Sequence, residues 1–186
     1  LWWRQEVPVA LKGANPARIA AARALVAVEK GRFIQEVLAE NPPAKKVDRA
    51  LAWHLALGVL RRRAELDGAL RGHLSRPLTG LDAEVRAVLR MGTFEKLFSR
   101  TKTYAVVDQA VRVTKALKLG RASGMVNAVL RRVEEAKHLS RSEKLNHPTW
   151  LIVRWDARYG AQVTEDWCRK NQDEPPLTLV RRGEGT

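Results

Sequence analysis

Apolar residues recur at helical spacing soon after the start of the chain. The segment NPARIAAARALVAVEKG places Asn15 before the apolar run, puts Pro16 at the first helical position and ends on Gly31. An asparagine cap, an N-terminal proline and a C-terminal glycine are the residues that these positions favour. A shorter helix is expected in RFIQEVLAE, where the segment NPP stops it. This part of the chain therefore predicts two helices.

The next apolar stripe is longer and predicts one continuous helix over residues 47–74. Its inward positions are Leu51, Leu55, Val59, Leu66 and Leu70. Gly58 lies inside this helix, where a glycine costs about 1 kcal/mol relative to alanine. We therefore expect a neighbouring helix to cross closely at Gly58.

Three more amphipathic segments follow the break SRPLTG. They cover residues 81–98, 103–118 and 123–137. Asp82 and Thr103 are the candidate N-caps of the first two, and Gly120 is the expected stop of the second. These segments add three helices to the prediction.

The segment SGMVNAVLRRVEEAK has a defined core face. Val126, Leu130 and Val133 share it at spacing i, i+4 and i+7, whereas Asn127 lies off it. Asn127 is a polar residue that a functional site could use, but we interpret it as a helix or interhelix hydrogen-bonding residue.

A further pair of helices is expected in PTWLIVRWDARYG and AQVTEDWCRKN. Trp150, Trp155 and Trp167 fall on apolar helix faces, a placement more typical of core packing than of base stacking. No strand pattern precedes Leu177, so the fold class is all-α. The end of the chain differs, because two prolines in DEPPLTLV hold the backbone extended and LTLV then predicts the first strand of a linker.

Charge is strongly uneven along the chain. The net charge is +14; residues 1–150 carry 28 Lys and Arg against 14 Asp and Glu, and residues 151–186 carry 6 against 6. An excess of this kind favours a polyanionic partner through Coulomb attraction and counterion release. A solubilising surface is the alternative, although such surfaces usually mix both signs. Three consecutive arginines, Arg61, Arg62 and Arg63, point in different directions around the helix and cannot share one face. Simple exposure to solvent is therefore as good an interpretation as nucleic-acid contact.

The order of these segments resembles the helical domain of NusB-type transcription antitermination factors. The resemblance covers residues 15–135, and its most specific piece is MVNAVLRR, which is similar to the family's FVNGVL segment. It implies a compact helical bundle that binds RNA.

The segment that follows resembles a second family. NHPTWLIVRWDARYG…NQDEPPLTLVR is similar to the signature with which ribosomal RNA cytosine-5 methyltransferases of the RsmB/Sun class join their RNA-binding and catalytic domains. We therefore expect an unexplained segment at 1–14, a NusB-like domain at 15–140, a helical linker subdomain at 141–174 and the start of a truncated downstream domain at 175–186. The resemblance implies ribosomal RNA and the chain's own C-terminal methyltransferase domain as partners of a monomer.

The chemistry of that class is missing from this chain. S-adenosylmethionine is expected only for the missing domain, because GEGT has no strand and helix around it and no Pro-Cys nucleophile motif is present. Cys168 is interpreted as a small helix residue, and one cysteine with four scattered histidines forms no metal-ligand pattern. The chain is expected to be a fragment without an active site, so whether it counts as an enzyme stays open.

The cellular compartment is predicted from three features that the sequence lacks: a pair of cysteines, a membrane-spanning apolar run and a signal peptide. One cysteine allows no internal disulfide, and no apolar run reaches the roughly 18 residues that a membrane span needs. The N-terminal segment also lacks the order of a signal peptide. These features predict a cytoplasmic protein.

The residues expected to bind RNA lie on or beside two of the expected helices. They are Arg18, Arg23, Arg121, Ser123, Met125 and Arg132. Arg18 corresponds to an arginine that the family uses for RNA, and its position in the first turn is expected to leave it free of the core. The start of SGMVNAVLRR offers free N–H groups to a phosphate. Met125 stands where the family has an aromatic residue, which weakens base stacking there.

Two other functions stay open. One is a free-standing antitermination factor that acts with a ribosomal-protein partner, which the residues beyond 140 argue against. The other is a protein-interaction adaptor, since NusB-like folds can present helix faces to proteins.

Overall fold

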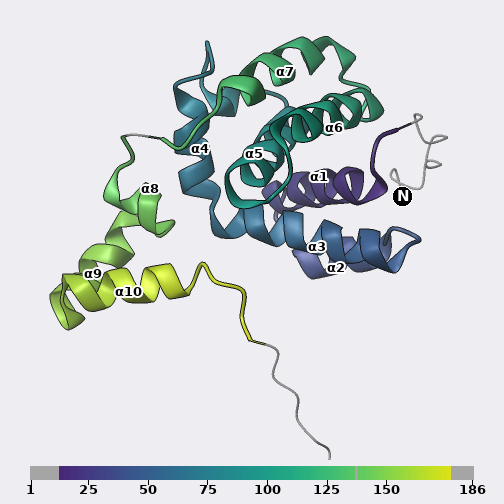
Figure 1. Cartoon of the computed structure of the whole chain (residues 1–186). Helices are drawn as coiled ribbons and strands as arrows, with labels where there is room; N and C mark the ends of the chain where they lie inside the picture. Colours follow the sequence, from purple (N-terminus) through teal and green to yellow (C-terminus); the bar gives the residue numbers. More distant parts are fainter. Residues whose placement is uncertain (1–12, 137, 177–186) are drawn as a thin grey trace, which may run out of the picture.

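A computed structural model describes residues 13–136 and 138–176, and the regular secondary structure of this part of the chain consists of helices (Figure 1). The elements in chain order are α1 (Pro16–Glu29), α2 (Ile34–Glu40), α3 (Lys46–Arg61), α4 (Arg63–Arg71), η1 (Leu78–Gly80), α5 (Ala83–Phe98), α6 (Thr103–Ala116), η2 (Gly120–Ala122), α7 (Ser123–Arg132), α8 (Arg141–Leu145), α9 (Thr149–Tyr159) and α10 (Ala161–Lys170). The all-α prediction is confirmed for these residues. The predicted segment 1–14 lies almost entirely, and the strand from Leu177 lies wholly, outside the described residues.

Helix α1 begins and ends as its sequence predicts. The Asn15 side chain accepts hydrogen bonds from the N–H groups of Ala17 at 2.8 Å and Arg18 at 3.3 Å, and Pro16 occupies the first helical position. Gly31 adopts φ +86°, a left-handed conformation that favours glycine. The cap satisfies two backbone donors that a helix start would otherwise leave without partners.

The expectation of one continuous helix over residues 47–74 is wrong. The chain breaks at Arg62, which adopts φ −111° and ψ 18° between α3 and α4. Periodicity did not reveal the break because Val59 and Leu66 are seven residues apart and both stay buried, so the apolar stripe keeps its phase. The break turns α4 so that it contacts both α5 and α8.

Helix α5 forms the centre of the bundle and contacts α1, α3, α4, α6 and α7 (Figure 1). Its residues from Ala87 to Glu95 are all buried. The close crossing expected at Gly58 is confirmed, because a Cβ atom there would lie 2.1 Å from Cζ of Phe94. Two helices therefore approach at a point where no larger residue fits.

Several expected helix ends differ from the structure. Asp82 occupies the N-cap position of α5 but its side chain makes no capping bond, and Lys102 rather than Thr103 precedes α6. Helix α6 ends at Ala116, before Gly120, because Lys118 takes the left-handed conformation at φ 63°. These ends depend on local backbone geometry that apolar periodicity does not report.

Helix α7 ends at Arg132 rather than at residue 137. The Lys96 ammonium donates to the carbonyl oxygens of Leu130 at 3.1 Å and Arg131 at 2.9 Å and so satisfies the end of the helix. Val126, Leu130 and Val133 are fully buried, as predicted. The core face is therefore correct although the helix is shorter.

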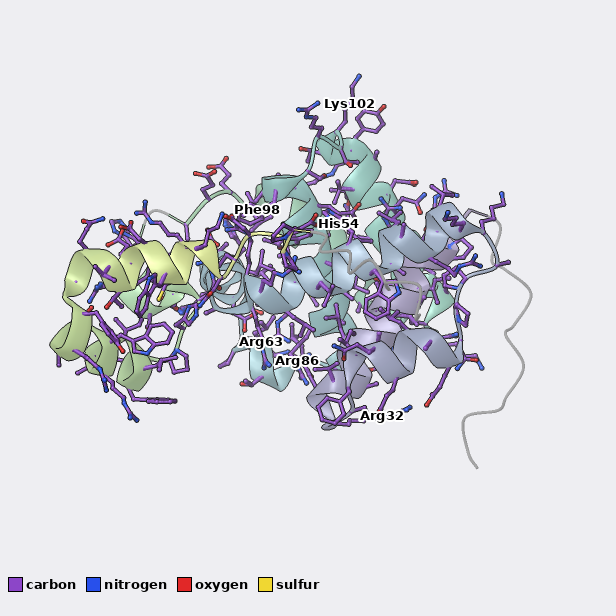
Figure 2. The ribbon with its side chains drawn as sticks, turned by 90° about the horizontal axis from the view of Figure 1, so that it is seen from below. Arg32, His54, Arg63, Arg86, Phe98 and Lys102 are labelled. Atoms are coloured by element: carbon purple, nitrogen blue, oxygen red, sulfur yellow. The ribbon has the colours of Figure 1, made fainter. Side chains whose placement is uncertain are left out.

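Helices α8, α9 and α10 enclose a second small core of Leu145, Ile152 and Cys168. Helix α8 is not among the helices expected from the sequence, and it starts with a capping box in which Ser140 and Glu143 satisfy each other's backbone N–H groups. The helical unit is joined to α4, since Asn146 Oδ1 accepts from the N–H of Glu65 at 3.0 Å. Beyond α10 the chain returns along α3, where His54 Nδ1 lies 3.1 Å from Glu174 Oε1, and Figure 2 shows His54 and Phe98 beside it.

The tryptophans of this unit are less buried than expected. Trp150 is 66% exposed and Trp167 is 43% exposed, so the expectation of core packing is wrong for both, and Trp155 is only partly buried against the small core. A two-helix layer that rests on α8 buries one side only, which leaves its outer faces in solvent. Within the described ranges, no helix is long and apolar enough to cross a membrane.

Candidate nucleic-acid interface

Two hollows lie on either side of α7. One, of about 640 Å³, lies between α7 and the connection from α4 to α5. The other, of about 660 Å³, lies between α6 and α7. The start of α7 separates them, so residues near that start face one hollow or the other.

The first hollow is rich in arginine and is called the arginine groove below. It is lined by His73, Leu74, Ser75, Arg76, Leu81, Asp82, Leu119, Arg121, Ala122, Met125, Ala128, Val129 and Arg132. Its three arginines are exposed, and none of them pairs with a carboxylate within residues 13–136 and 138–176. Among the residues that the structure describes, Asp82 is the one acidic residue of the lining. The groove therefore combines an excess of positive charge with an apolar floor.

Two short 3₁₀ turns place two of these arginines, whereas Arg132 is the last residue of α7. Pro77 and η1 close the connection that carries Arg76, and η2 delivers Arg121 to the start of α7. The positive end of the α7 dipole also lies here. Guanidinium groups without carboxylate partners beside a helix start form an arrangement that suits phosphate oxygens.

The structure brings together only some of the residues that the sequence predicted. Arg121, Met125 and Arg132 share the arginine groove. Ser123 lines the α6–α7 hollow instead, and its hydroxyl donates to the carbonyl oxygen of Gly120 at 2.6 Å. Arg23 is exposed on α1 and lines neither hollow. The predicted residues therefore do not form one site.

The expectation that Arg18 is free of the interior is wrong. Its Nε donates to Glu95 Oε2 at 3.0 Å and its Nη2 donates to Glu95 Oε1 at 2.5 Å. Only 11% of the Arg18 side chain and 5% of the Glu95 side chain are exposed. The first turn of α1 rests on α5 at this point, so Arg18 joins the two helices rather than facing solvent.

Two further residues of the groove, Arg76 and His73, are not among the residues predicted from the sequence. The segment RGHLSRPLTG carried a signal, because it places three cationic or titratable side chains beside a turn that has to lie at the surface. Apolar periodicity alone identifies this segment only as a break between helices. Its proximity to α7 depends on tertiary packing.

The sequence and the solved structures of other proteins identify this fold. The family model described as "NusB family" matches residues 15–135, which is the span of the predicted resemblance. The chain belongs to the NusB family. A crystal structure of PH0851 has the same fold, with a TM-score of 0.62 at 18% identity over 83% of this chain and 38% of that chain.

Curated relatives extend beyond the NusB domain. "Ribosomal RNA small subunit methyltransferase B" of Xanthomonas campestris pv. campestris is 37% identical over 168 residues, which are 89% of this chain and 38% of that protein. The protein with the same name from Salmonella enteritidis PT4 is 30% identical over 179 residues, or 91% of this chain and 41% of that protein. The chain thus spans about two fifths of the length of these relatives.

Other charges of the NusB domain are internal to it. Glu29 on α1 bonds to Arg86 at 2.5 Å and also to Arg90, whose Nε donates to Asp67 at 2.6 Å. Burial raises the pKa of Glu29, but the hydrogen bonds from the two arginines outweigh it and hold that pKa below its ordinary value. This network joins α1, α4 and α5 and leaves Arg86 and Arg90 unavailable to a ligand.

Cys168 has the environment of a structural residue. It is fully buried in the small core, and burial raises the pKa of its thiol. A thiol with a raised pKa stays protonated at neutral pH and is a poor nucleophile. Within the described ranges, no group of three or more His, Cys, Asp or Glu is arranged to hold a metal ion.

Proposed function

We propose that this chain is the RNA-binding, substrate-targeting N-terminal region of a small-subunit ribosomal RNA cytosine-5 methyltransferase. The observation that carries the proposal is the arginine groove, in which Arg76, Arg121 and Arg132 surround an apolar floor. The names of the relatives supply the class of RNA, because they are ribosomal RNA small subunit methyltransferases.

The groove suits a strand of RNA better than a rigid duplex. Guanidinium groups contact phosphate oxygens in a bidentate manner, while the floor of Leu81, Leu119 and Met125 receives an apolar face such as that of an unstacked base. Met125 contributes contact area but no aromatic face. Binding of this kind positions the RNA and needs no chemistry from the groove.

The methyl-transfer chemistry belongs to a separate domain in this proposal. The residues present do not fit S-adenosylmethionine, since a Rossmann-like cofactor site needs a strand, a turn and a helix, and no strand occurs within residues 13–136 and 138–176. We assign the cofactor to the chain's own C-terminal methyltransferase domain, place the protein in the cytoplasm and take it to be a monomer.

A protein-interaction adaptor is the second candidate. The α6–α7 hollow favours it, because Tyr104, Val107 and Val111 line that hollow and Tyr104 is 73% exposed. An aromatic side chain at the edge of an apolar hollow is typical of protein interfaces. Salt dependence separates the two candidates, since RNA binding releases counterions and apolar docking does not.

The test compares two adjacent arginines of α7. Arg132 lines the arginine groove, whereas Arg131 lines the α6–α7 hollow, and both lie in the last turn of the same helix. Arg132→Ala and Arg121→Ala should each weaken binding of small-subunit ribosomal RNA several-fold, and Arg131→Ala should change it little although it removes the same charge. Equal losses for all three would mean diffuse attraction and would contradict the groove.

A methyl-transfer assay with the same purified chain tests whether the catalytic chemistry lies in a separate domain. Methyl label from S-adenosylmethionine should not enter small-subunit ribosomal RNA when this chain is the only protein present. Clear turnover by the chain alone would overturn the placement of the chemistry in a separate domain.

A further inference from the structure

The outer face of α9 carries a stripe of aromatic, aliphatic and cationic side chains. The stripe consists of Trp150, Val153, Arg154, Ala157 and Arg158, which follow one another at i, i+3, i+4, i+7 and i+8 and so share one helix face. All five are exposed; Trp150 is 66% and Val153 is 59% exposed. The opposite face of α9 carries Ile152, which belongs to the small core. The stripe therefore points away from the rest of the unit.

The stripe is positively charged although residues 151–186 as a whole carry equal numbers of cationic and acidic residues. Each acidic residue from 151 to 176 already has a partner. The pairs are Asp156 with Arg141, Glu165 with Arg169, Asp166 with Gln162, Asp173 with Lys170 and Glu174 with His54. Arg154 has no carboxylate partner within the described ranges, and Arg158 lies 5.5 Å from the ring of Tyr159. The two arginines of the stripe are thus left for an external anion.

We infer that this outer stripe of α9 is a second RNA contact, in which Arg154 and Arg158 meet phosphates and Trp150 stacks on an unpaired base. Charge complementarity selects RNA as the partner, because the stripe contains two cations, an exposed indole and no carboxylate. Base stacking on aromatic side chains combined with arginine contacts is the usual way in which proteins hold single strands. An apolar protein surface docked here would leave both guanidinium groups buried without a counter-charge.

The inference rests on the proposed RNA binding but concerns a different part of the molecule. Figure 1 shows α9 and α10 outside the bundle, connected to it through α8 and lying away from α7. An RNA that occupied both surfaces would have to extend from the NusB domain to the helical unit. The helical unit would then help to orient the RNA as well as link two domains.

The experiment measures the affinity of the full chain for a single-stranded ribosomal RNA oligonucleotide over a range of salt concentrations. Trp150→Ala should weaken binding roughly fivefold or more, the loss of about one stacked base. Trp150→Phe should retain most of the affinity because it keeps a π face. Trp150→Leu should behave like the alanine variant, because it keeps only apolar bulk.

The arginines are tested by the slope of log affinity against log salt concentration. Arg154→Ala and Arg158→Ala should each reduce the slope by about 0.7, the release expected for one phosphate of a single strand. Arg169→Ala is the matched control, because it removes the same charge from α10 at a residue already paired with Glu165. Its slope should equal that of the unmodified chain, and unchanged melting temperatures should show that all variants fold.

The outcomes separate this inference from the proposed function. If the unmodified chain fails to bind RNA, both the proposed function and the inferred RNA contact at the stripe are wrong. If it binds but the variants in Trp150, Arg154 and Arg158 bind equally well, only the stripe is overturned. A dimer in sedimentation that Trp150→Ala converts to a monomer, with RNA affinity unchanged, would assign the stripe to a second copy of the chain and would also overturn the inference.

Discussion

Replacement of Arg18 by alanine should destabilise the protein far more than an ordinary surface substitution. The change removes both hydrogen bonds to Glu95 and leaves its carboxylate in the interior, where only 5% of the side chain is exposed. Breaking a buried ion pair by removing one partner costs about 3 to 5 kcal/mol, because the remaining charge loses its compensation. That is a large share of the roughly 5 to 15 kcal/mol that stabilises a typical domain.

Urea and thermal unfolding measure this effect. For a chain of 186 residues, a loss of this size lowers the melting temperature by roughly 6 to 20 °C. Arg23→Ala is the matched control, since it removes an exposed arginine from the same helix and should change the free energy of unfolding by no more than about 0.5 kcal/mol. The double substitution Arg18→Met with Glu95→Leu should recover most of the loss, because it removes both charges together.

A free energy of unfolding for Arg18→Ala within about 0.5 kcal/mol of the unmodified chain would refute this reasoning. It would mean that the pair is open in solution and that Arg18 is free to contact RNA, as the sequence first suggested. RNA affinities of Arg18 variants therefore have to be measured well below their melting temperatures. Otherwise a folding defect would be taken for a lost contact.

Two further predictions concern stability. Acid should weaken the link between α1, α4 and α5, because the pKa of Glu29 is lowered in the folded protein: its contribution is present above its ordinary pKa of 4.5 and is lost as pH falls through the lower folded pKa. Urea unfolding measures the free energy of unfolding between pH 7 and pH 3. That free energy should fall less on acidification for Glu29→Gln than for the exposed control Glu36→Gln, and an equal fall for both variants would contradict the network. Gly58→Ala should destabilise by about 1 to 3 kcal/mol despite the better helix propensity of alanine, because the added Cβ would lie 2.1 Å from Cζ of the buried Phe94 ring and would force that ring to shift. Gly124→Ala, where the added Cβ would meet no other described part of the chain beyond its own helix backbone within 4 Å, should stabilise by up to about 1 kcal/mol. A gain at both positions would mean that the crossing at Gly58 is loose.

Features that depend on local sequence were predictable. The cap at Asn15, the core face of Val126, Leu130 and Val133 and the close crossing at Gly58 each follow from residue type and helical period. The break at Arg62 was not, because a single residue outside the helix leaves the apolar stripe in phase. The exposure of Trp150 also depended on tertiary structure, since an apolar helix face is buried only where another element covers it.

The arginines show most clearly why the site was harder to predict than the fold. In sequence Arg18, Arg90 and Arg121 are equivalent positive residues on helices. In the structure Arg18 is largely enclosed and Arg90 is buried beside carboxylates from other helices, whereas Arg121 is exposed in the arginine groove without an ion-pair partner in the described ranges. Which arginine meets which carboxylate depends on helix packing, so a sequence pattern cannot assign it.

This division of the arginines also limits how strongly RNA binding can depend on salt. Net charge alone would suggest that many phosphates are neutralised, yet a buried guanidinium paired with a carboxylate releases no counterion when RNA binds. If the three arginines of the groove contact a single strand, the slope of log affinity against log salt should be roughly −2, and the two arginines of the α9 stripe would bring it to roughly −3.5. A slope near −10 would require most of the +14 charge to act together. Such a value would show that the positive surface binds as a diffuse field and that neither the groove nor the stripe is a defined contact.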